Sequence, residues 1–464
     1  MKKYSDLITQ TFDFPTKEFK VENGQLSFNE VPLMELIEKY GTPLKISYLP
    51  KIRQQIQKAY SVFNQAIEKL DYEGKYIYAY CTKSNHFKFV METVLGEGCK
   101  LETSSAYDIN IIRRLYESGL ISKDILIVCN GFKPDNYKKA IVDLINDGFH
   151  NCIPVLDNIE EIDYYLENAE QKINVGIRVA ADEEPDFEVY TSRLGIRYSR
   201  VLKLYEEKIK NSDKVDLKLI HYFINSGIKD TQYYWNELNK FITKYTELRS
   251  ICDTIDSVDI GGGFPIKYSL TYEYDHAYMA EAIVEIIQSI CKQAGVSCPH
   301  IVSEFGSYTV GESGATIYSI LEKKQQNDKE LWYIIDGSLI THIPDTWGKN
   351  HKFVMLAVNN WDNDYTQVHI GGITCDSDDY YNSETHSANI YLPDFDKMKE
   401  EKQYIGFFHT GAYQEALAGY GGTSHCLIPD PKHVIVDHDG MGGFTYKVYR
   451  EQQKPEQMLE ILGY

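Results

Sequence analysis

The segment "KLETSSAYDINIIRRLYESG", residues 100 to 119, contains two patterns that indicate the fold class. It begins with a short apolar run and passes through a polar turn. It continues as a segment with apolar residues at positions i, i+3 and i+4 that ends in glycine. The first pattern is typical of a buried strand and the second of an amphipathic helix. The stretch therefore predicts one strand–helix unit.

The same unit recurs along the chain up to about residue 310. Seven further apolar runs alternate with helix-like segments: YIYAYC (76–81), ILIVCN (125–130), CIPVLD (152–157), INVGIRV (173–179), LKLIHYFI (217–224), SVDIGGG (257–263) and HIVSEF (300–305). Alternation of strands and helices implies a parallel sheet, and eight units over roughly 230 residues favour a closed (β/α)8 barrel of the TIM type. A doubly wound open sheet is the alternative that the pattern leaves open.

The pattern changes after about residue 310. Runs such as ELWYIIDGSLI (330–340) and KHVIVDHDG (432–440) are typical of strands separated by turns, with few helices between them. They predict a C-terminal β-sandwich or β-barrel domain. We therefore predict three parts: residues 1–45, which join the β domain, the barrel at 46–310, and the β domain at 311–464.

Composition limits the classes of function. The chain has 464 residues and a formal net charge of −20, which argues against nucleic-acid binding because the phosphate backbone is also negative. Its nine cysteines form no CxxC pair and no Cys/His cluster at zinc spacing, so we expect neither a disulfide framework nor a metal site. The N-terminus has no apolar stretch typical of a signal peptide, and no apolar run reaches the length of a membrane span. We expect a cytoplasmic protein that does not bind membranes.

Polar residues follow the predicted barrel strands. In a (β/α)8 barrel, the carboxyl ends of the strands meet at one mouth, where the chemistry takes place. The residues expected at this mouth are Lys83, Glu102, Asn130, Arg178, the stretch 221–226, Gly261 to Gly263, and Glu304.

Three of these features fit one cofactor. The glycines of "IGGGFP" can bring backbone N–H groups close to a phosphate. Lys83, just past a buried strand, can form a Schiff base with an aldehyde, and Glu304 can keep a ring nitrogen protonated. Together these features predict pyridoxal 5′-phosphate (PLP) as the cofactor.

The sequence resembles the fold-type III, alanine-racemase-like PLP decarboxylases that act on basic amino acids. The resemblance rests on YCTKSN (80–85), DIGGGFP (259–265), SEFG (303–306), CDSDD (375–379) and GAY (411–413). Within this family, the biosynthetic arginine decarboxylases are the most similar, through LETSS (101–105), IVCNGFK (127–133), IPDTWG (343–348), GITCDSD (372–378) and GFFHTGAYQEAL (406–417).

The resemblance implies roles for individual residues. The catalytic residues would be Lys83, Glu304 and Cys375, and the two candidates for binding the substrate's far end are Asp345 and Asp376. The cofactor would also contact Glu102, Arg178, Phe223, Ser226, Gly261, Gly262, Gly263, Ser307 and Tyr413. Two positions depart from the family pattern, because Phe223 replaces a histidine expected on the cofactor ring and Ser307 replaces a phosphate-binding arginine.

Cys375 stands beside Asp376, Asp378 and Asp379. Nearby carboxylates disfavour a thiolate and raise the pKa of a thiol, which suits a group that must carry a proton. The hypothesis is that Cys375 protonates the substrate's α-carbon after the carboxylate has left. In the family this loop comes from the neighbouring subunit, so the resemblance implies a homodimer with shared active sites.

The function that these residues favour is conversion of L-arginine to agmatine and CO2, a step of polyamine biosynthesis. Alternatives within the fold are a decarboxylase for ornithine or lysine, of either chirality, or for diaminopimelate, and an amino-acid racemase. A non-enzymatic alternative is an inactive, decarboxylase-like regulatory protein that binds a partner, with Phe223 and Ser307 in its favour.

Overall fold

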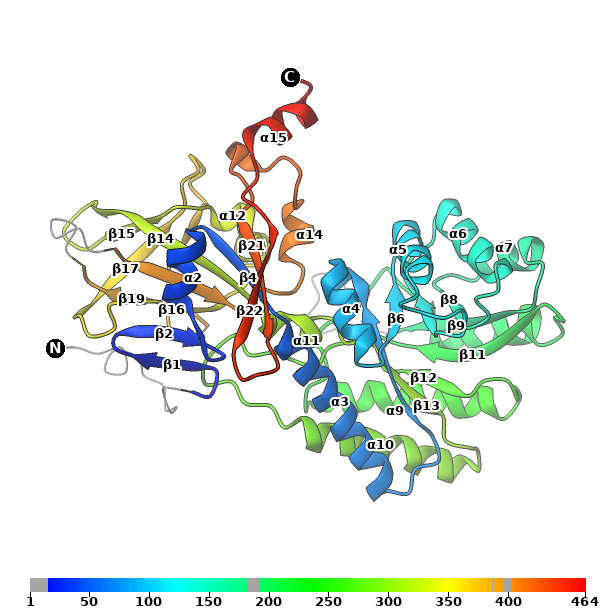
Figure 1. Ribbon diagram of the computed structural model, residues 1–464. Coiled ribbons are helices and arrows are strands. Elements are labelled where there is room, and N and C mark those ends of the chain that lie inside the picture. The colour runs from blue at the N-terminus through cyan, green and yellow to red at the C-terminus, as the bar shows by residue number, and fades with distance from the viewer. Residues whose placement is uncertain (1–15, 182–191, 386, 396–401) are drawn as a thin grey trace. The chain divides into compact units, whose positions relative to one another are not determined.

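A computed structural model of the protein describes residues 16–181, 192–385, 387–395 and 402–464 (Figure 1). The chain divides into two compact units. The barrel unit comprises Arg53–Pro265 and Tyr274–Thr309, and the β unit comprises the described residues up to Ile52, Ile266–Glu273, and the chain from Val310 onward.

The barrel unit contains a closed ring of eight parallel strands. They are β5 (Tyr76–Cys81), β6 (Lys100–Thr103), β7 (Ile127–Cys129), β8 (Cys152–Leu156), β9 (Ile173–Ala180), β11 (Val215–His221), β12 (Ser257–Asp259) and β13 (His300–Ser303). The ring closes because β13 pairs with β5 at one point and β8 pairs with β9 at another. A short strand, β10 (Ile196–Arg197), pairs with β9 outside the ring. The predicted (β/α)8 barrel is confirmed, and each of its eight strands lies within or overlaps a predicted run.

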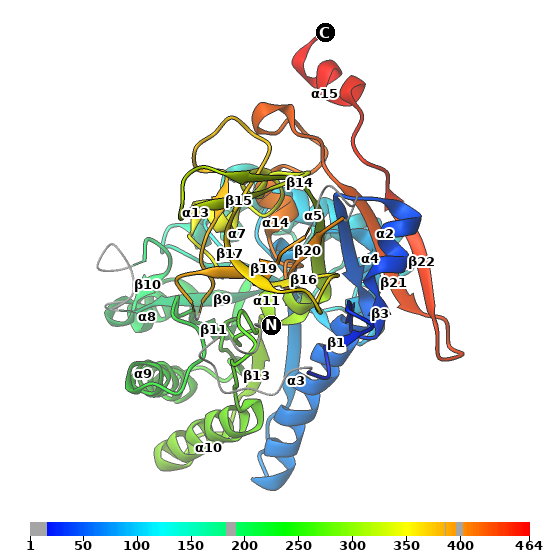
Figure 2. The same ribbon diagram turned by 90° about the vertical axis from the view of Figure 1, so that its left-hand side faces the viewer.

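Helices cover the outside of the ring (Figures 1 and 2). They are α3 (Leu49–Lys69), α4 (Lys88–Gly96), α5 (Ala106–Glu117), α6 (Asp135–Asn146), α7 (Glu161–Asn168), α8 (Tyr198–Leu204), which continues into a π-turn, η2 (Tyr205–Ile209), α9 (Gln232–Arg249) and α10 (His276–Ala294). Helix α5 shows how the sequence builds them. The Ser105 hydroxyl caps its first turn by accepting the Asp108 backbone N–H, and Ile109, Ile112 and Leu115 are buried on one face.

Side chains fill the interior of the ring. Val128, Ile153, Val155 and Leu219 form a buried cluster contributed by three strands. Gly176 in β9 leaves room for this cluster, because a Cβ atom there would lie 2.7 Å from Leu219 Cδ1 and 3.1 Å from Val155 Cγ2. The ring is therefore a packed core, and chemistry is confined to its mouth.

The β unit is built on a ten-stranded sheet. Its main path runs β18 (Tyr380–Tyr381), β17 (Tyr365–Gly371), β15 (Leu331–Ile335), β14 (Gly314–Gln325), β4 (Leu44–Tyr48), β21 (Lys432–His438) and β22 (Phe444–Arg450). Strand β20 (Tyr404–Phe408) pairs with β14 and with β16 (Val354–Ala357), and β19 (Ile390–Pro393) pairs with β17. A separate three-stranded sheet contains β1 (Phe19–Glu22), β2 (Gln25–Phe28) and β3 (Val31–Pro32).

The N-terminal chain contributes a central strand to this unit. Strand β4 lies between β14 and β21, and all five of its residues are buried. Helix α2 (Leu33–Tyr40) lies beside β4 and β21 in Figures 1 and 2, and its Leu33 and Leu36 belong to one buried cluster with Ile46 and Val434. The remaining helices are short: α11 (Ser307–Val310), α12 (Leu339–His342), α13 (Asp345–Gly348), α14 (Gln414–Ala418), α15 (Pro455–Leu462) and the 3-10 turns η3 (Gly311–Ser313) and η5 (His425–Leu427).

Two segments of the chain differ from the predicted division. Residues 46–52 and Ile266–Glu273 belong to the β unit, although both lie inside the predicted barrel range of 46–310. The backbone N–H of Lys267 donates to Glu312 Oε1 (3.2 Å), and the carbonyl oxygen of Lys267 meets the His409 imidazole. Both partners are distant in sequence, so no local pattern could reveal this excursion.

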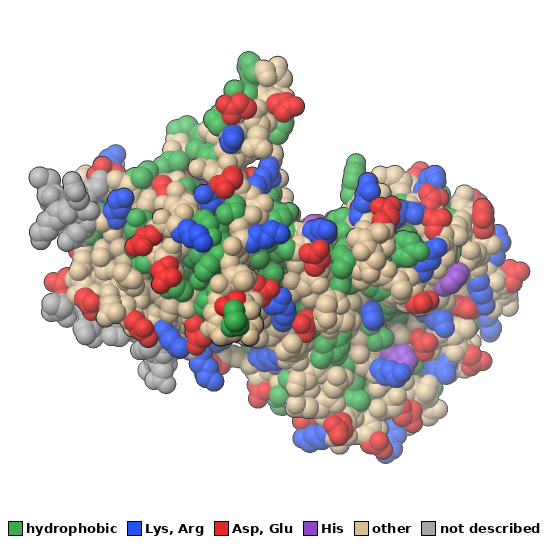
Figure 3. All heavy atoms as spheres, viewed as in Figure 1, with side chains coloured by type: hydrophobic (Ala, Val, Ile, Leu, Met, Phe, Trp, Pro, Cys, Tyr) green, Lys and Arg blue, Asp and Glu red, His purple; other side chains and the backbone are tan. Residues whose placement is uncertain are grey.

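No helix in the described ranges is both long and apolar enough to cross a membrane. Acidic and basic side chains are mixed over the visible face of the molecule in Figure 3. On that face, the net charge of −20 is therefore not gathered into one acidic patch.

Candidate active site

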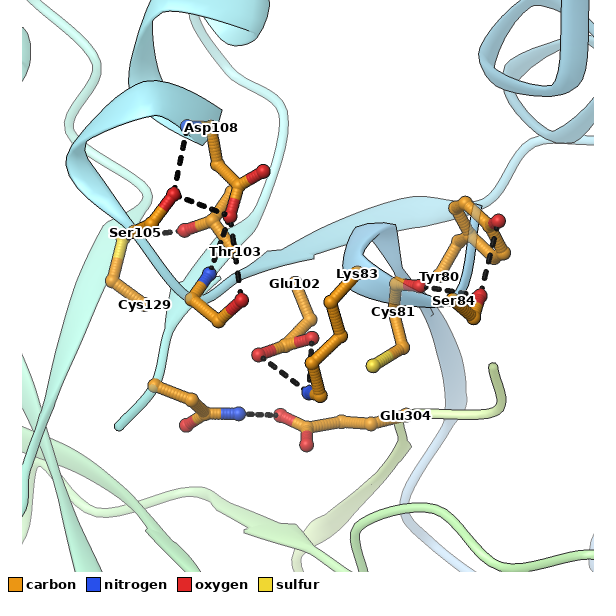
Figure 4. Close-up of polar contacts among 12 residues, drawn as sticks. Tyr80, Cys81, Lys83, Ser84, Glu102, Thr103, Ser105, Asp108, Cys129 and Glu304 are labelled. Carbon is orange, nitrogen blue, oxygen red and sulfur yellow. Dashed lines mark hydrogen bonds and ion pairs between the residues drawn. The ribbon is translucent and has the colours of Figure 1, made fainter. Parts of the chain in front are cut away.

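The first feature of the barrel mouth is an ion pair between Lys83 and Glu102 (Figure 4). Strand β5 ends at Cys81, and the 3-10 turn η1 (Thr82–Ser84) presents the lysine above the strand end. Lys83 Nζ lies 3.2 Å from Glu102 Oε2, and the Ser84 hydroxyl fixes the turn by donating to the Cys81 carbonyl (2.8 Å). The Glu102 side chain is fully buried, whereas that of Lys83 is 45% exposed. The turn therefore leaves the Lys83 amine accessible at the mouth of the barrel.

The second feature is Glu304, which directly follows β13. Its Oε1 accepts a hydrogen bond from Asn130 Nδ2 (2.6 Å), and Asn130 directly follows β7. Both side chains are buried. Glu304 lies close to Lys83 and Glu102 in Figure 4, so strands from opposite parts of the sequence deliver these groups to one place.

A buried cluster of ionisable groups supports Glu304. The His221 Nδ1, one carboxylate oxygen of Asp259 and one of Glu304 all lie within 4.8 Å of one another. Burial raises the pKa of Asp259 to about 7, and burial together with the charge of Asp259 raises the pKa of Glu304 well above its usual value. Burial lowers the pKa of His221 to about 4. The imidazole is therefore neutral near neutral pH, and the two carboxyl groups hold protons unusually strongly.

The glycine loop packs against the other strand ends. Gly261 has a φ of +66°, and a Cβ atom there would lie 2.6 Å from the Tyr222 carbonyl oxygen and 3.4 Å from the Phe223 ring. A Cβ atom at Gly262 would lie 2.6 Å from the Glu304 carbonyl oxygen. Only glycine fits this loop, and it brings backbone N–H groups close to the mouth, as a phosphate requires.

The other predicted barrel residues lie near these groups. Arg178 lies in β9, and its charge contributes to the lowered pKa of His221. Phe223 is half-buried beside Gly261, and Ser226 is half-buried in the loop that follows β11. Ser307 is the first residue of α11, three positions after Glu304. The predicted barrel residues therefore follow strand ends or, for Glu102 in β6 and Arg178 in β9, lie within a strand near its carboxyl end.

The predicted thiol and acids belong to the β unit. Cys375 is exposed in the loop between β17 and β18, and its Sγ lies 3.6 Å from the Sγ of Cys426. The contact with Cys426 is the first cause that raises the pKa of Cys375, and the charge of Asp376 adds to it. The predicted direction of the shift is confirmed, but its main cause is a second thiol rather than the carboxylates.

The carboxylates of this loop have different surroundings. Asp376 is half-exposed, and its Oδ2 lies 3.3 Å from His425 Nε2. Asp378 is exposed. Asp379 is buried, and it accepts the Leu339 backbone N–H (2.8 Å) and the Thr374 hydroxyl (2.7 Å), so it holds the loop in place rather than lying in solvent.

Asp345 and Tyr413 also lie in the β unit. Asp345 is buried at the start of α13, where Gln414 Nε2 donates to its Oδ2 (2.8 Å) and Lys349 Nζ lies 3.1 Å from its Oδ1. Tyr413 follows β20 with a φ of +68° and is half-buried, with Lys349 Nζ 5.7 Å from the centre of its ring. Both oxygens of Asp345 therefore already have cationic or amide partners.

Comparison with known proteins defines the class of protein. A family model described as "Pyridoxal-dependent decarboxylase, pyridoxal binding domain" matches residues 53–311, which is more than half of the chain. The chain therefore belongs to the pyridoxal-dependent decarboxylases, and its cofactor is pyridoxal 5′-phosphate. The enzyme class and the cofactor predicted from the sequence are confirmed.

Individual relatives place the chain among amino-acid decarboxylases. It is 22% identical to the biosynthetic arginine decarboxylase of Vibrio vulnificus, over 91% of this chain and 83% of that protein. It is 26% identical to the diaminopimelate decarboxylase of Staphylococcus aureus, over 86% and 90% respectively. Its fold matches the solved structure of the biosynthetic arginine decarboxylase of Campylobacter jejuni with a TM-score of 0.80 at 21% identity, over 97% of this chain and 89% of that one.

The mouth of the barrel fits the cofactor. Among the described residues, Asn130 Oδ1 and Asp259 Oδ2 are buried without a hydrogen-bond partner beside Glu304. Lys83 offers an accessible amine, Glu304 a carboxyl group, and the glycine loop a surface that a side chain would fill. These three groups suit the aldehyde, the ring nitrogen and the phosphate of pyridoxal phosphate, respectively.

The sequence did not mark every residue of the site. Asp259 stands directly before the glycine loop, but only the fold shows that its carboxyl group lies beside Glu304. Position alone was a usable signal, because Asp259 ends a barrel strand. The sequence did not indicate a role for Cys426 or His425, because their contacts with Cys375 and Asp376 join residues about fifty positions apart.

Proposed function

We propose that this protein decarboxylates L-arginine to agmatine and CO2 as a homodimer. The observation that carries the proposal is the adjacency, in one loop, of a thiol that retains its proton and a half-exposed carboxylate, Cys375 and Asp376. Two relatives named as biosynthetic arginine decarboxylases support the substrate, since each aligns with at least nine-tenths of this chain.

Residues of the barrel mouth hold the cofactor in this proposal. When bound, pyridoxal phosphate supplies an electron sink that allows the α-carboxylate to leave as CO2. Lys83 would hold the aldehyde end of the cofactor, and the carboxylate of Glu102, 3.2 Å from Lys83 Nζ, orients the amine. The phosphate would be held by the N–H groups of Gly262 and Gly263, because the Gly261 N–H already donates to Asp259 Oδ1 (2.8 Å). The hydroxyl groups of Ser226 and Ser307 and the Tyr413 side chain would add to this site, and Arg178 and Phe223 would complete the surroundings of the cofactor.

Glu304 controls the proton on the ring nitrogen. Its raised pKa means that the carboxyl group arrives with a proton that it can share with a nitrogen base. Asn130 Nδ2 donates to Glu304 Oε1 (2.6 Å), and the other oxygen, Oε2, lies 3.8 Å from His221 Nδ1. Asp259 and His221 are buried next to Glu304 and help to exclude water from its carboxyl group.

Cys375 delivers the final proton. Its contact with Cys426 keeps the thiol protonated at neutral pH, so Sγ can donate to the substrate's α-carbon once the carboxylate has gone.

Asp376 binds the far end of the substrate. A guanidinium is planar and carries donors that suit a carboxylate in a two-point contact. Asp376 is half-exposed. Its neighbour His425 is also half-exposed, so the substrate can displace the imidazole from the Asp376 carboxylate. Asp345 remains a second candidate for this role, but the substrate would have to displace Lys349 from its carboxylate.

The proposed roles are divided between the two units of the chain, and the resemblance to the decarboxylase family supports a dimer. Lys83 and Glu304 belong to the barrel unit, and Cys375 and Asp376 belong to the β unit. We propose that the Cys375 loop of one protomer acts at the barrel mouth of its partner, so each active site needs both chains.

Diaminopimelate is the second candidate substrate. The diaminopimelate decarboxylase of Staphylococcus aureus aligns with 86% of this chain at a slightly higher identity of 26%. Diaminopimelate carries a second carboxylate, which would require a cation at the far end of the pocket. The Asp376 carboxylate would repel that group, which favours arginine.

The test measures CO2 release by the purified, PLP-loaded protein. The substrates are L-arginine, L-ornithine, L-lysine and meso-diaminopimelate, with D-enantiomers of the first three in parallel. We expect release from L-arginine at a kcat/KM at least about tenfold above that for any other, because one well-placed charged contact contributes about 1.4 kcal/mol or more. Preferred CO2 release from diaminopimelate would show that diaminopimelate, not L-arginine, is the substrate. No CO2 release from any of these amino acids would refute the proposed activity.

A further inference from the structure

Two close pairs of thiols in this protein have the same sulfur separation and opposite exposure. The Sγ atoms of Cys375 and Cys426 lie 3.6 Å apart, and both residues are exposed in the β unit. The Sγ atoms of Cys129 and Cys152 also lie 3.6 Å apart, but both are buried in neighbouring strands of the barrel. Cys129 additionally accepts the Thr103 hydroxyl (3.3 Å), and Figure 4 shows these two residues together.

Two neighbouring contacts bring the exposed pair together. Cys375 meets Cys426, and the next residue, Asp376, meets the preceding residue, His425. The loop that carries Cys375 is anchored below by the buried Asp379, and the turn that carries Cys426 is anchored by the hydrogen bond from Leu427 N–H to the Ser424 carbonyl (2.9 Å). The two segments therefore hold both sulfurs side by side at the surface of the single protomer. In the proposed dimer, they would line the same mouth that must admit the substrate.

We propose that Cys375 and Cys426 form a reversible oxidative modification site, which a peroxide converts to a disulfide. A disulfide has a sulfur–sulfur bond of about 2.05 Å, so the two atoms must approach by roughly 1.5 Å. Exposed side chains on two loops can make this movement by rotating about χ1. The buried pair in the barrel strands cannot, because packed side chains surround it and peroxide has no access.

The chemistry balances with hydrogen peroxide as the oxidant. One thiolate sulfur attacks a peroxide oxygen, so an S–O bond forms, the O–O bond breaks, and the leaving hydroxide takes up a proton as water. The second sulfur then attacks the sulfenic sulfur, so an S–S bond forms, the S–O bond breaks, and a second water leaves. Two thiols lose two electrons and two protons in total, and one peroxide becomes two waters.

The consequence for activity rests on the proposed function. A disulfide removes the proton from Cys375 Sγ, so the oxidised protein lacks the group that protonates the substrate. General acid catalysis contributes about 10²- to 10⁴-fold to a rate. The turnover rate, measured as CO2 release, should therefore fall by about 10²-fold or more on oxidation. A thiol reductant should restore it.

The pH dependence of the oxidation provides a further readout. A thiolate, not a thiol, attacks peroxide, and the neighbouring thiol raises the pKa of Cys375. Disulfide formation should therefore be slow near neutral pH and accelerate as the pH rises.

The experiment treats the PLP-loaded protein with hydrogen peroxide, blocks free thiols with iodoacetamide, and maps the digest by mass spectrometry without reduction. We expect a peptide that links Cys375 to Cys426 and disappears with dithiothreitol, while Cys129 and Cys152 remain unlinked. Free, alkylated Cys375 and Cys426 after treatment, or a link between Cys375 residues of two chains, would overturn the proposal.

A Cys426→Ser variant supplies the control, with each protein compared before and after treatment. It should give no internal link, and prolonged peroxide should drive its Cys375 to the sulfinic acid, which dithiothreitol does not reverse. If the wild type loses activity as irreversibly as this variant does, Cys426 does not protect Cys375 and the proposal fails.

The two proposals fail in different ways. A mapped Cys375–Cys426 link with unchanged CO2 release would leave the modification site standing and refute the catalytic role of Cys375. Absence of the link in an enzyme that decarboxylates arginine would refute the modification site and leave the proposed function intact.

Discussion

The barrel mouth and the Cys375 loop both carry several acidic groups, but they control protons in opposite ways. In the mouth, Asp259 and Glu304 are buried at strand ends, and burial itself raises their pKa values. In the loop, Cys375 and Asp376 lie at the surface, and the pKa of the thiol is raised first by a neighbouring thiol. In the mouth, the low dielectric of a packed core raises the pKa values, whereas in the loop a contact between two short segments raises the pKa of the thiol.

The barrel mouth and the Cys375 loop also differ in how many contacts hold their side chains in place. Groups at the ends of barrel strands are fixed by backbone pairing on both sides, so their geometry depends on the whole fold. Groups in the loop depend on a few local contacts, such as those of Asp379. Changes in the mouth should therefore affect both stability and activity, and changes in the loop should affect activity alone.

The largest effect should come from Lys83→Ala in the mouth. Loss of the amine removes the covalent link to the cofactor, so we expect CO2 release to fall to the detection limit and the visible absorbance of the bound cofactor to disappear. Lys88→Ala is the matched control, because Lys88 is an exposed helix residue that pairs only weakly with Glu92 (3.5 Å). A variant Lys83→Ala that retains the visible band would refute the role given to Lys83.

The next effect should come from Cys375→Ala in the loop. Removal of a general acid should lower kcat by about 10²- to 10⁴-fold and leave cofactor absorbance unchanged. Ser377→Ala in the same exposed loop should have no such effect. Full activity with a clean product in Cys375→Ala would contradict the assignment.

Asp259→Asn should change the pH dependence of the free energy of unfolding. The unfolded carboxyl group loses its proton near pH 3.8, while the folded one holds it to about pH 7. Folded protein thus loses stability as the pH rises between these values, by about 4 kcal/mol at most. Asparagine does not ionise, so its advantage over wild type in urea unfolding of the cofactor-free protein should grow across this range.

Asp256→Asn provides the control for that measurement, because the Asp256 side chain is about half exposed, with Lys218 Nζ 3.7 Å from its Oδ2 and the Ser257 hydroxyl donating to its Oδ1 (2.8 Å). It should show no growing advantage between pH 4 and 7. A pH-independent difference for Asp259→Asn as well would mean that Asp259 is not a buried acid with a raised pKa.

The smallest effect should come from Asp376→Asn. Loss of a charged contact to the guanidinium costs about 1.5 to 3 kcal/mol, which corresponds to a rise in the KM for L-arginine of roughly 10- to 100-fold. Asp378→Asn is the neighbouring control, because Asp378 is exposed. Equal effects from both variants would indicate that the loop acts through its general charge, not through Asp376.

The sequence revealed the barrel because its strands are buried on both sides. Such strands consist of apolar runs, as YIYAYC does at Tyr76–Cys81, and the polar residue after each run marks the mouth. Lys83, Glu102 and Glu304 could therefore be found from position alone. The resemblance to known decarboxylases then supplied their roles.

The β unit resisted prediction because its contacts are long-range. Strand β4 pairs with segments about 270 and 390 residues away, and nothing local in Leu44–Tyr48 indicates a central strand. The contacts of Asp345 with Gln414 and of Cys375 with Cys426 likewise join distant loops. Pairs of this kind appear only when the chain has folded.

The central claim is that the mouth of one protomer and the Cys375 loop of its partner form one active site. The most direct test mixes Lys83→Ala protein with Cys375→Ala protein under conditions that allow subunits to exchange. Random pairing makes about half of the dimers mixed, each with one intact site, so activity should return to about a quarter of the wild-type value. If mixed dimers form and activity does not rise above that of the separate variants, the two regions do not meet across the dimer, and the account is wrong.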